Sequence, residues 1–172
     1  DEMRCTMLEM SLIKHCSPTL ASLKTANLFS YSYSTERDLR KSIRYWNEQM
    51  SCKGIRLTVM KKKDNRALIY VCRVSKLESV LAGADVAAFL KKYGYDGMGV
   101  DGALRRLKKR LRSSGEFPHE IGIFLGYPLE DVTGFIENEG KGFVEVGFWK
   151  VYGDKENAEK TFCKYRKCTD IY

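Results

Sequence analysis

The stretch IRLTVMKKKDNRALIYVCRV, residues 55–74, contains two β-strand patterns with a turn between them. Its first part, residues 55–61, alternates Ile55, Leu57 and Val59 with polar residues, as a strand with one buried face does. Residues 67–74 are rich in β-branched and aromatic side chains, which strands favour. The pair Asp64-Asn65 between them favours a tight turn. The stretch therefore predicts a β-hairpin.

Periodicity on both sides of the hairpin predicts one further strand before it, one strand after it, and several short helices. The earlier strand is Asn27 to Tyr33, and Ser34 or Thr35 caps a helix that runs to Met50. The later strand is expected over residues 143–152. The other predicted helices are 2–15, ended by Pro18, and 75–82, 84–93, 100–112, 119–126, 129–138 and 154–166.

These elements follow no regular strand–helix–strand rhythm, so we expect an α+β fold with a small, mostly antiparallel sheet packed with several short helices. The chain has 172 residues and contains no Pro/Ser linker or repeat, which predicts a single domain over residues 1–172. No apolar run reaches the length of a membrane span, and residues 1–17 lack the apolar core of a secretory signal. We therefore expect a soluble, cytoplasmic protein.

The six cysteines contain no CxxC pair, and a chain of this length and aliphatic content does not need disulfides. Free, mostly buried thiols are the expectation. Cys16 follows His15, so an enzyme that uses a cysteine nucleophile and a histidine base is one alternative function. Neighbouring residues rarely provide that geometry, which favours a packing role for this pair.

The formal net charge of +8 is unevenly distributed. Residues 1–112 carry 23 Lys/Arg against 11 Asp/Glu, whereas residues 113–172 carry 7 against 11. The predicted helix 100–112 is amphipathic and strongly basic, so binding of a polyanion or nucleic acid is a second alternative function. The two helices joined at Gly126-Tyr127-Pro128 resemble a helix-turn-helix, but Glu130 and Asp131 at the start of the second would repel phosphate, so nucleic-acid binding is disfavoured.

His119 is one of two histidines and stands beside Glu120. An imidazole and a carboxylate together suit metal ligation or general base catalysis. Adjacent helical residues point in different directions, and the sequence HEIGIF lacks the second histidine of HExxH, so a capping or packing role for His119 competes with this interpretation. Trp149 and Tyr152, in the predicted last strand, fall on opposite faces, so one of them is available to stack on a ligand.

Several strings occur together in an order that resembles a bacterial family catalogued as domain of unknown function 3793, found mainly in anaerobes. They are HCSPTLA (15–21), KTANLF (24–29), GEFPHEIG (115–122), LGYPLEDV (125–132), WKVYGD (149–154) and YRKCT (165–169). The resemblance covers about residues 7 to 170. It implies a role in iron, haem or redox-cofactor handling. The basic helix 100–112 lies outside these strings.

The leading hypothesis is a protein that binds a small ligand or a metallocofactor, with His119, Glu120, Tyr127 and Trp149 in one cleft. His119 and Glu120 are the candidate metal ligands. The candidate ligand-binding residues are Cys16, Lys24, Asn27, His119, Glu120, Tyr127, Trp149 and Lys150. The sequence assigns no catalytic residue, no particular cofactor and no oligomeric state.

Overall fold

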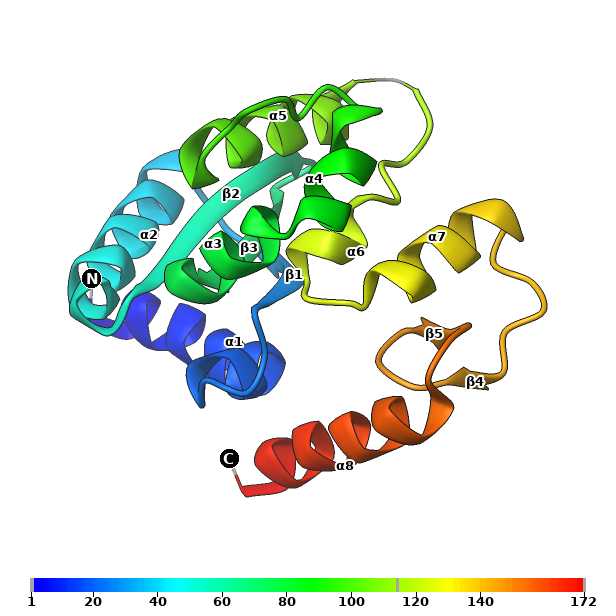
Figure 1. The fold of residues 1–172 in the computed structure, drawn as a ribbon. Helices are drawn as coiled ribbons and strands as arrows, with labels where there is room; N and C mark the ends of the chain where they lie inside the picture. The colour runs from blue at the N-terminus through cyan, green and yellow to red at the C-terminus, as the bar shows by residue number, and fades with distance from the viewer. Residues whose placement is uncertain (1, 114, 172) are drawn as a thin grey trace.

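A computed structural model describes residues 2–113 and 115–171. Its central sheet has three antiparallel strands in the order β1-β3-β2 (Figure 1). The strands are β1 (Ala26–Ser32), β2 (Ile55–Lys63) and β3 (Arg66–Arg73). The predicted hairpin is confirmed, because β2 and β3 pair across a turn in which Asp64 and Asn65 have φ angles of 52° and 58°. This left-handed conformation suits the right-handed twist of a two-residue hairpin turn.

Helices cover both faces of the sheet. Consecutive side chains of a strand point to opposite faces, so one strand contributes to two cores. Ala67, Ile69 and Val71 of β3 pack with α1 (Glu2–Leu20) and α2 (Glu36–Met50). Tyr70 and Cys72 pack in a second core with the helices that follow the sheet. The helices contributing to this second core are α3 (Val74–Ala82), α4 (Ala84–Lys91), α5 (Val100–Arg112), α6 (Ile121–Phe124) and α7 (Leu129–Glu137). The fold is α+β, as the sequence predicts.

The segment after α7 has a small core of its own. It comprises β4 (Glu145–Val146), β5 (Lys150–Val151) and α8 (Lys155–Ile171), and its buried residues are Trp149, Val151, Ala158, Phe162 and Tyr165. The ring of Tyr127 packs against this cluster and also against the second core of the sheet. The segment therefore joins the body of the protein through Tyr127, α7 and the contact of α8 with α1.

The prediction of one strand over residues 143–152 is wrong. The chain turns back between β4 and β5, which pair antiparallel, and the amide of Gly147 donates to the carbonyl oxygen of Trp149. A Cβ atom at Gly147 would collide with the ring of Phe162, so only glycine permits this close approach. Alternation of apolar and polar residues cannot distinguish one strand from two that are joined by a turn at a glycine.

The prediction that the first helix covers residues 2–15 and is ended by Pro18 is also wrong. The helix α1 continues to Leu20 and contains Pro18 in its last turn. The amide of Ala21 donates to the carbonyl oxygen of Ser17 at 2.9 Å, so the turn closes around the proline. The other predicted helices are present with shifted ends, and Thr35 caps α2 by accepting a hydrogen bond from the amide of Asp38.

The cysteines whose side chains are described, Cys16, Cys52, Cys72, Cys163 and Cys168, are free thiols, of which three are buried. Within residues 2–113 and 115–171, no helix combines the length and the hydrophobicity that crossing a bilayer requires.

An ion pair between the buried Glu120 and the partly buried Arg110 fixes the start of α6 on α5. The carboxylate of Glu120 is completely buried and accepts from Nε and Nη2 of Arg110, so the two side chains form a bidentate pair. The hydroxyl of Tyr95 donates to the same carboxylate at 3.0 Å. A buried carboxylate is tolerated only when its oxygens are paired in this way. The residues before α6 are therefore held in one position.

Replacing this carboxylate is expected to destabilise the fold. The Glu120→Gln substitution keeps the shape of the side chain but leaves the Arg110 guanidinium without its counter-charge. We expect the free energy of unfolding to fall by about 2–4 kcal/mol, measured by urea denaturation. Glu116→Gln, at an exposed position nearby, is the matched control and is expected to change it by less than about 0.5 kcal/mol. Equal stability of the two variants would contradict a structural role for the pair.

Candidate functional site

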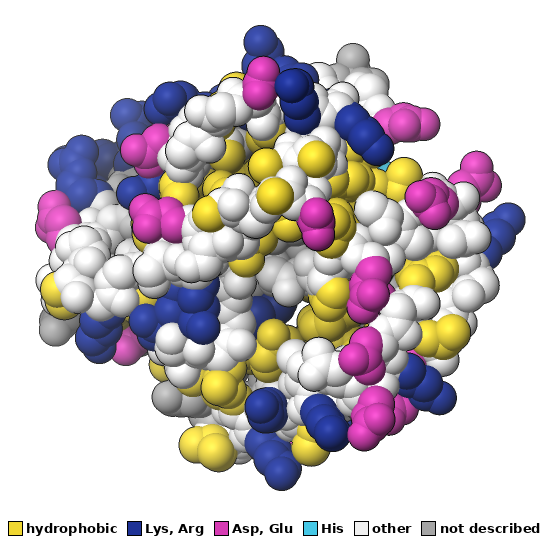
Figure 2. Space-filling model, viewed as in Figure 1, with side chains coloured by type: hydrophobic (Ala, Val, Ile, Leu, Met, Phe, Trp, Pro, Cys, Tyr) yellow, Lys and Arg dark blue, Asp and Glu magenta, His cyan; other side chains and the backbone are white. Residues whose placement is uncertain are grey.

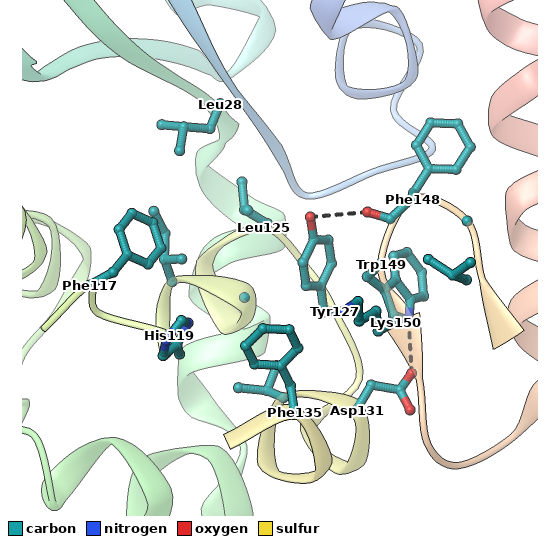
Figure 3. A pocket seen from close by; sticks show the side chains of 15 residues that line it. Leu28, Phe117, His119, Leu125, Tyr127, Asp131, Phe135, Phe148, Trp149 and Lys150 are labelled. Carbon is teal, nitrogen blue, oxygen red and sulfur yellow. Dashed lines mark hydrogen bonds between the residues drawn. The ribbon is translucent and has the colours of Figure 1, made fainter. Parts of the chain in front are cut away.

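A cavity of about 430 Å³ opens between α6, α7 and the β4–β5 turn (Figure 3). Its size lies within the range of about 300–1,000 Å³ that is usual for small-molecule sites. Leu28 of β1 also lines it. The remaining lining residues are Phe117, His119, Ile121, Gly122, Leu125, Tyr127, Asp131, Val132, Phe135, Val146, Gly147, Phe148, Trp149 and Lys150.

Aromatic rings form two opposite walls of this pocket. On one side the imidazole of His119 lies 5.6 Å from the ring of Phe117 and 5.1 Å from that of Phe135, centroid to centroid. On the other side Tyr127 and Trp149 stack at 4.9 Å with an interplanar angle of 29°. Figure 3 shows Tyr127 standing between the His119 side and the Trp149 side. Most of the surface that a ligand would meet is therefore flat and apolar.

The turn between α6 and α7 places Tyr127 in the pocket. Gly126 ends α6 with a φ of +83°, and a Cβ atom there would lie 2.7 Å from Oγ1 of Thr25. The amide of Tyr127 then donates to the carbonyl oxygen of Gly122 at 2.9 Å. A side chain at Gly122 would meet Val132 at 2.8 Å and the Tyr127 ring at 3.0 Å. Both glycines are therefore required for the ring to pack where it does.

Asp131 holds the second wall in place. Its side chain is buried, and Oδ2 accepts from Nε1 of Trp149 at 2.8 Å. Its Oδ1 accepts from the amides of Tyr152 at 2.8 Å and Gly153 at 3.0 Å. The carboxylate also lies in the first turn of α7, where the helix dipole favours negative charge. Sequence reasoning treated Asp131 only as an acid that repels phosphate, because its partners lie some twenty residues further along the chain.

Two polar side chains of the pocket remain able to bind a ligand. The imidazole of His119 is exposed, and it has no hydrogen-bond partner among the residues that the structure describes. The ammonium of Lys150 donates to the carbonyl oxygen of Gly140 at 2.9 Å and lies over the rings of Phe135 and Phe143. An ammonium has three donors, so Lys150 can also bind an acceptor on a ligand.

Four of the eight candidate residues from the sequence thus line one pocket: His119, Tyr127, Trp149 and Lys150. Two others lie elsewhere. Glu120 follows His119 but points into the protein, where Arg110 and Tyr95 occupy its oxygens. Asn27 accepts a hydrogen bond from Thr19 at 2.6 Å and joins β1 to the end of α1.

Lys24 and Cys16 form a buried pair behind Tyr127. The ammonium of Lys24 lies 5.6 Å from the centroid of the Tyr127 ring and 6.0 Å from that of Tyr165. Burial lowers the pKa of Lys24 to about 8, and burial raises the pKa of the Cys16 thiol to about 12. Neither residue lines the pocket.

The state of Cys16 argues against its use as a nucleophile. A cysteine nucleophile must be a thiolate that substrate can reach. Cys16 is completely buried in the core between α1 and the sheet, and its raised pKa favours the neutral thiol. The ring of His15 stacks on Phe29 at 5.3 Å and belongs to the same region, apart from the pocket. This geometry does not favour the alternative of a Cys/His enzyme.

A bare metal ion also lacks a ligand set in the part of the chain that the structure describes. No group of three or more His, Cys, Asp or Glu side chains there is arranged to hold one. Of the side chains that line the pocket and could bind a metal, His119 is the one without a hydrogen-bond partner in the described part of the chain.

Replacing Lys24 by Met is expected to stabilise the protein at neutral pH. Below pH 8 the folded and unfolded states both carry the Lys24 charge, and the folded state bears the cost of burying it. Between pH 8 and 10.5 the unfolded state binds more protons, so the wild-type stability rises with pH through Lys24. The Cys16 thiol has the opposite effect on the wild-type stability above pH 9. It ionises at a lower pH in the unfolded state than in the folded state, so the stability falls as the pH rises.

Lys24→Met should therefore raise the free energy of unfolding by about 2–3 kcal/mol at pH 7, and the advantage should shrink between pH 8 and 9. Urea denaturation at pH 7.0, 8.0 and 9.0 measures both effects. The control Lys167→Met, at an exposed position of α8, should show neither. A Lys24→Met variant that is less stable than the wild type at pH 7 would contradict a buried, costly charge.

Breaking the Asp131 contacts is expected to loosen the second wall. Asp131→Asn keeps one oxygen to accept from the Tyr152 and Gly153 amides but puts an NH2 donor against the indole N–H of Trp149. We expect a loss of about 2–4 kcal/mol in the free energy of unfolding and a red shift of Trp149 emission. Asp154→Asn, at an exposed position after β5, is the control. Unchanged emission in Asp131→Asn would show that the carboxylate does not position Trp149.

Comparison with known proteins identifies the family of the chain but no activity. Neither the curated proteins nor the solved structures provide a match. A family model described as "protein of unknown function (DUF3793)" matches residues 12–172, which include α6, α7, the β4–β5 turn and hence the main walls of the pocket. The chain therefore belongs to the DUF3793 family.

Proposed function

We propose that this protein binds a small, planar, largely apolar ligand in the pocket between α6, α7 and the β4–β5 turn. The observation that carries the proposal is the aromatic lining of a cavity of about 430 Å³. Its aromatic residues are Phe117, Tyr127, Phe135, Phe148 and Trp149. Flat rings stack best on other flat rings, and burial of such surfaces contributes most of the affinity of apolar sites.

Within this class, a haem-type metallocofactor fits the pocket better than a free iron ion. A free ion needs several protein ligands, and the described residues offer no such group. A porphyrin brings four ring nitrogens of its own and needs one axial ligand from the protein. His119, with an unpaired imidazole on the aromatic wall, can be that ligand. Lys150 can pair with an acidic substituent of the ring.

This assignment corresponds to a binding role in the cytoplasm, in the handling of haem, iron or a redox cofactor. The carboxylate that lines the pocket, Asp131, is already occupied by three hydrogen bonds and supports the wall. The proposal therefore gives His119 and Lys150 the contacts to the ligand, and Asp131 the positioning of Trp149.

Trp149 provides a direct reporter of binding, because the chain has only two tryptophans. In a Trp46→Phe variant all tryptophan emission comes from the pocket, whereas a Trp149→Phe variant reports from α2. Titration with haemin, and separately with riboflavin as a planar ligand that needs no axial histidine, is expected to quench Trp149 with saturation. The Trp149→Phe variant, which retains Trp46, should show only the weak, non-saturating decrease in emission that a light-absorbing solute causes.

The His119→Ala substitution then separates the two levels of the proposal. With haemin, it should abolish the Soret shift and weaken binding at least tenfold, whereas riboflavin affinity should change less than about threefold. His15→Ala, at the other histidine, is the matched control and should leave both unchanged. Quenching by riboflavin without a His119-dependent Soret shift would refute the metallocofactor. No saturable quenching by either compound would refute the planar-ligand site.

A further inference from the structure

A second concave site lies on another side of the molecule, between α2, β2 and the end of α5. Its volume is about 230 Å³. Leu39, Ile43 and Val59 form its apolar part. Five cations complete its lining: Arg40, Arg44, Lys62, Lys108 and Arg112. We call this site the basic groove. Lys and Arg side chains gather at the upper left of Figure 2, the side on which α2 and α5 lie in Figure 1.

Most of the charge in the basic groove is uncompensated. Glu36 pairs with Lys62 at 2.8 Å, and the pKa of Glu36 is lowered mainly by that contact. In the described part of the chain the other four cations form no ion pair. Burial, together with the nearby Arg112 and Lys62, lowers the pKa of Lys108. Like charges held this closely raise the energy of the folded state, and a bound anion relieves the repulsion.

The spacing of the cations suits a chain of phosphates. Arg40 and Arg44 are one turn apart on α2, and Lys108 and Arg112 are one turn apart on α5. Four residues advance about 6 Å along a helix. Successive phosphates of one B-DNA strand lie roughly 7 Å apart, because each nucleotide combines a rise of about 3.4 Å with a rotation about the axis. Each helix can therefore contact two neighbouring phosphates, and the arginines can bind phosphate oxygens in a bidentate manner.

The lining also indicates which kind of anion fits. None of the residues that line the groove is an exposed large apolar side chain, which a membrane-surface site normally inserts into lipid. No aromatic side chain lines it, so it offers no platform for stacking on bases. Cations without exposed large apolar or aromatic side chains around them favour contact with the phosphate backbone of a nucleic acid.

We propose that the basic groove binds the phosphate backbone of a nucleic acid without reading its sequence. The acids at the start of α7, which argue against a helix-turn-helix, do not line this groove. Of the four groove cations that lie on helices, two come from the basic helix α5 and two from α2. The site is separate from the aromatic pocket, so neither proposal depends on the other.

Fluorescence anisotropy of a labelled 20-base-pair DNA duplex tests the proposal with the whole 172-residue chain. Four phosphate contacts predict that the logarithm of the association constant falls with the logarithm of salt concentration with a slope of about −3.6. Arg44→Gln with Lys108→Gln removes two contacts. The slope should become shallower by about 1.8, and affinity at 0.1 M salt should fall on the order of 10- to 100-fold. Arg40→Gln with Arg112→Gln should do the same, which keeps the test valid if one pair fails to fold.

The matched control is Arg166→Gln with Lys167→Gln, which removes the same charge from exposed positions on α8, across the molecule from α5 (Figure 1). It should lower the affinity less than about threefold, and His119→Ala should leave it unchanged. An equal loss in the α8 control would show that net charge alone causes binding. Affinity that stays flat with salt, or capture by vesicles containing 30 % phosphatidylserine without duplex binding, would also overturn the proposal.

Discussion

The three hydrogen bonds accepted by the Asp131 carboxylate are the constraint on which the candidate site depends. The β4–β5 turn is too short to be stable alone, since each strand has two residues. Asp131 attaches it to α7 through the indole of Trp149 and two backbone amides. A buried carboxylate is costly unless every oxygen is paired, so the same requirement that stabilises Asp131 also fixes the turn.

A second buried carboxylate performs the corresponding task on the opposite wall. Glu120 fastens the start of α6 to α5 and to Tyr95, and His119 is the residue directly before it. Because neighbouring residues point in different directions, the anchored Glu120 leaves the His119 ring outside the core, between Phe117 and Phe135. Two acidic residues thus hold the two walls, and the space between them is lined by rings.

The elements of local origin could be predicted from the sequence, and those set by distant partners could not. The hairpin β2–β3 and the amphipathic α5 follow from periodicity and turn residues that lie within about twenty positions of one another. The turn at Gly147 depends on the ring of Phe162, which lies further along the chain in α8.

Residue type and the family strings single out His119, Tyr127, Trp149 and Lys150, and these four residues line one pocket. Glu120 was singled out for the same reason, but its orientation depends on Arg110. The basic groove combines three elements that no single stretch reveals.

The most direct test of the aromatic pocket is a ¹H–¹⁵N correlation spectrum of the protein titrated with riboflavin, a diamagnetic planar ligand. The account predicts saturable shifts of backbone amides confined to residues 117–135 and 144–153, with the amides of Gly122 and Gly147 among the largest. The amides of α2 should not move. Shifts that are absent at saturating riboflavin, or that lie mainly outside these two segments, would contradict a planar-ligand site between α6, α7 and the β4–β5 turn.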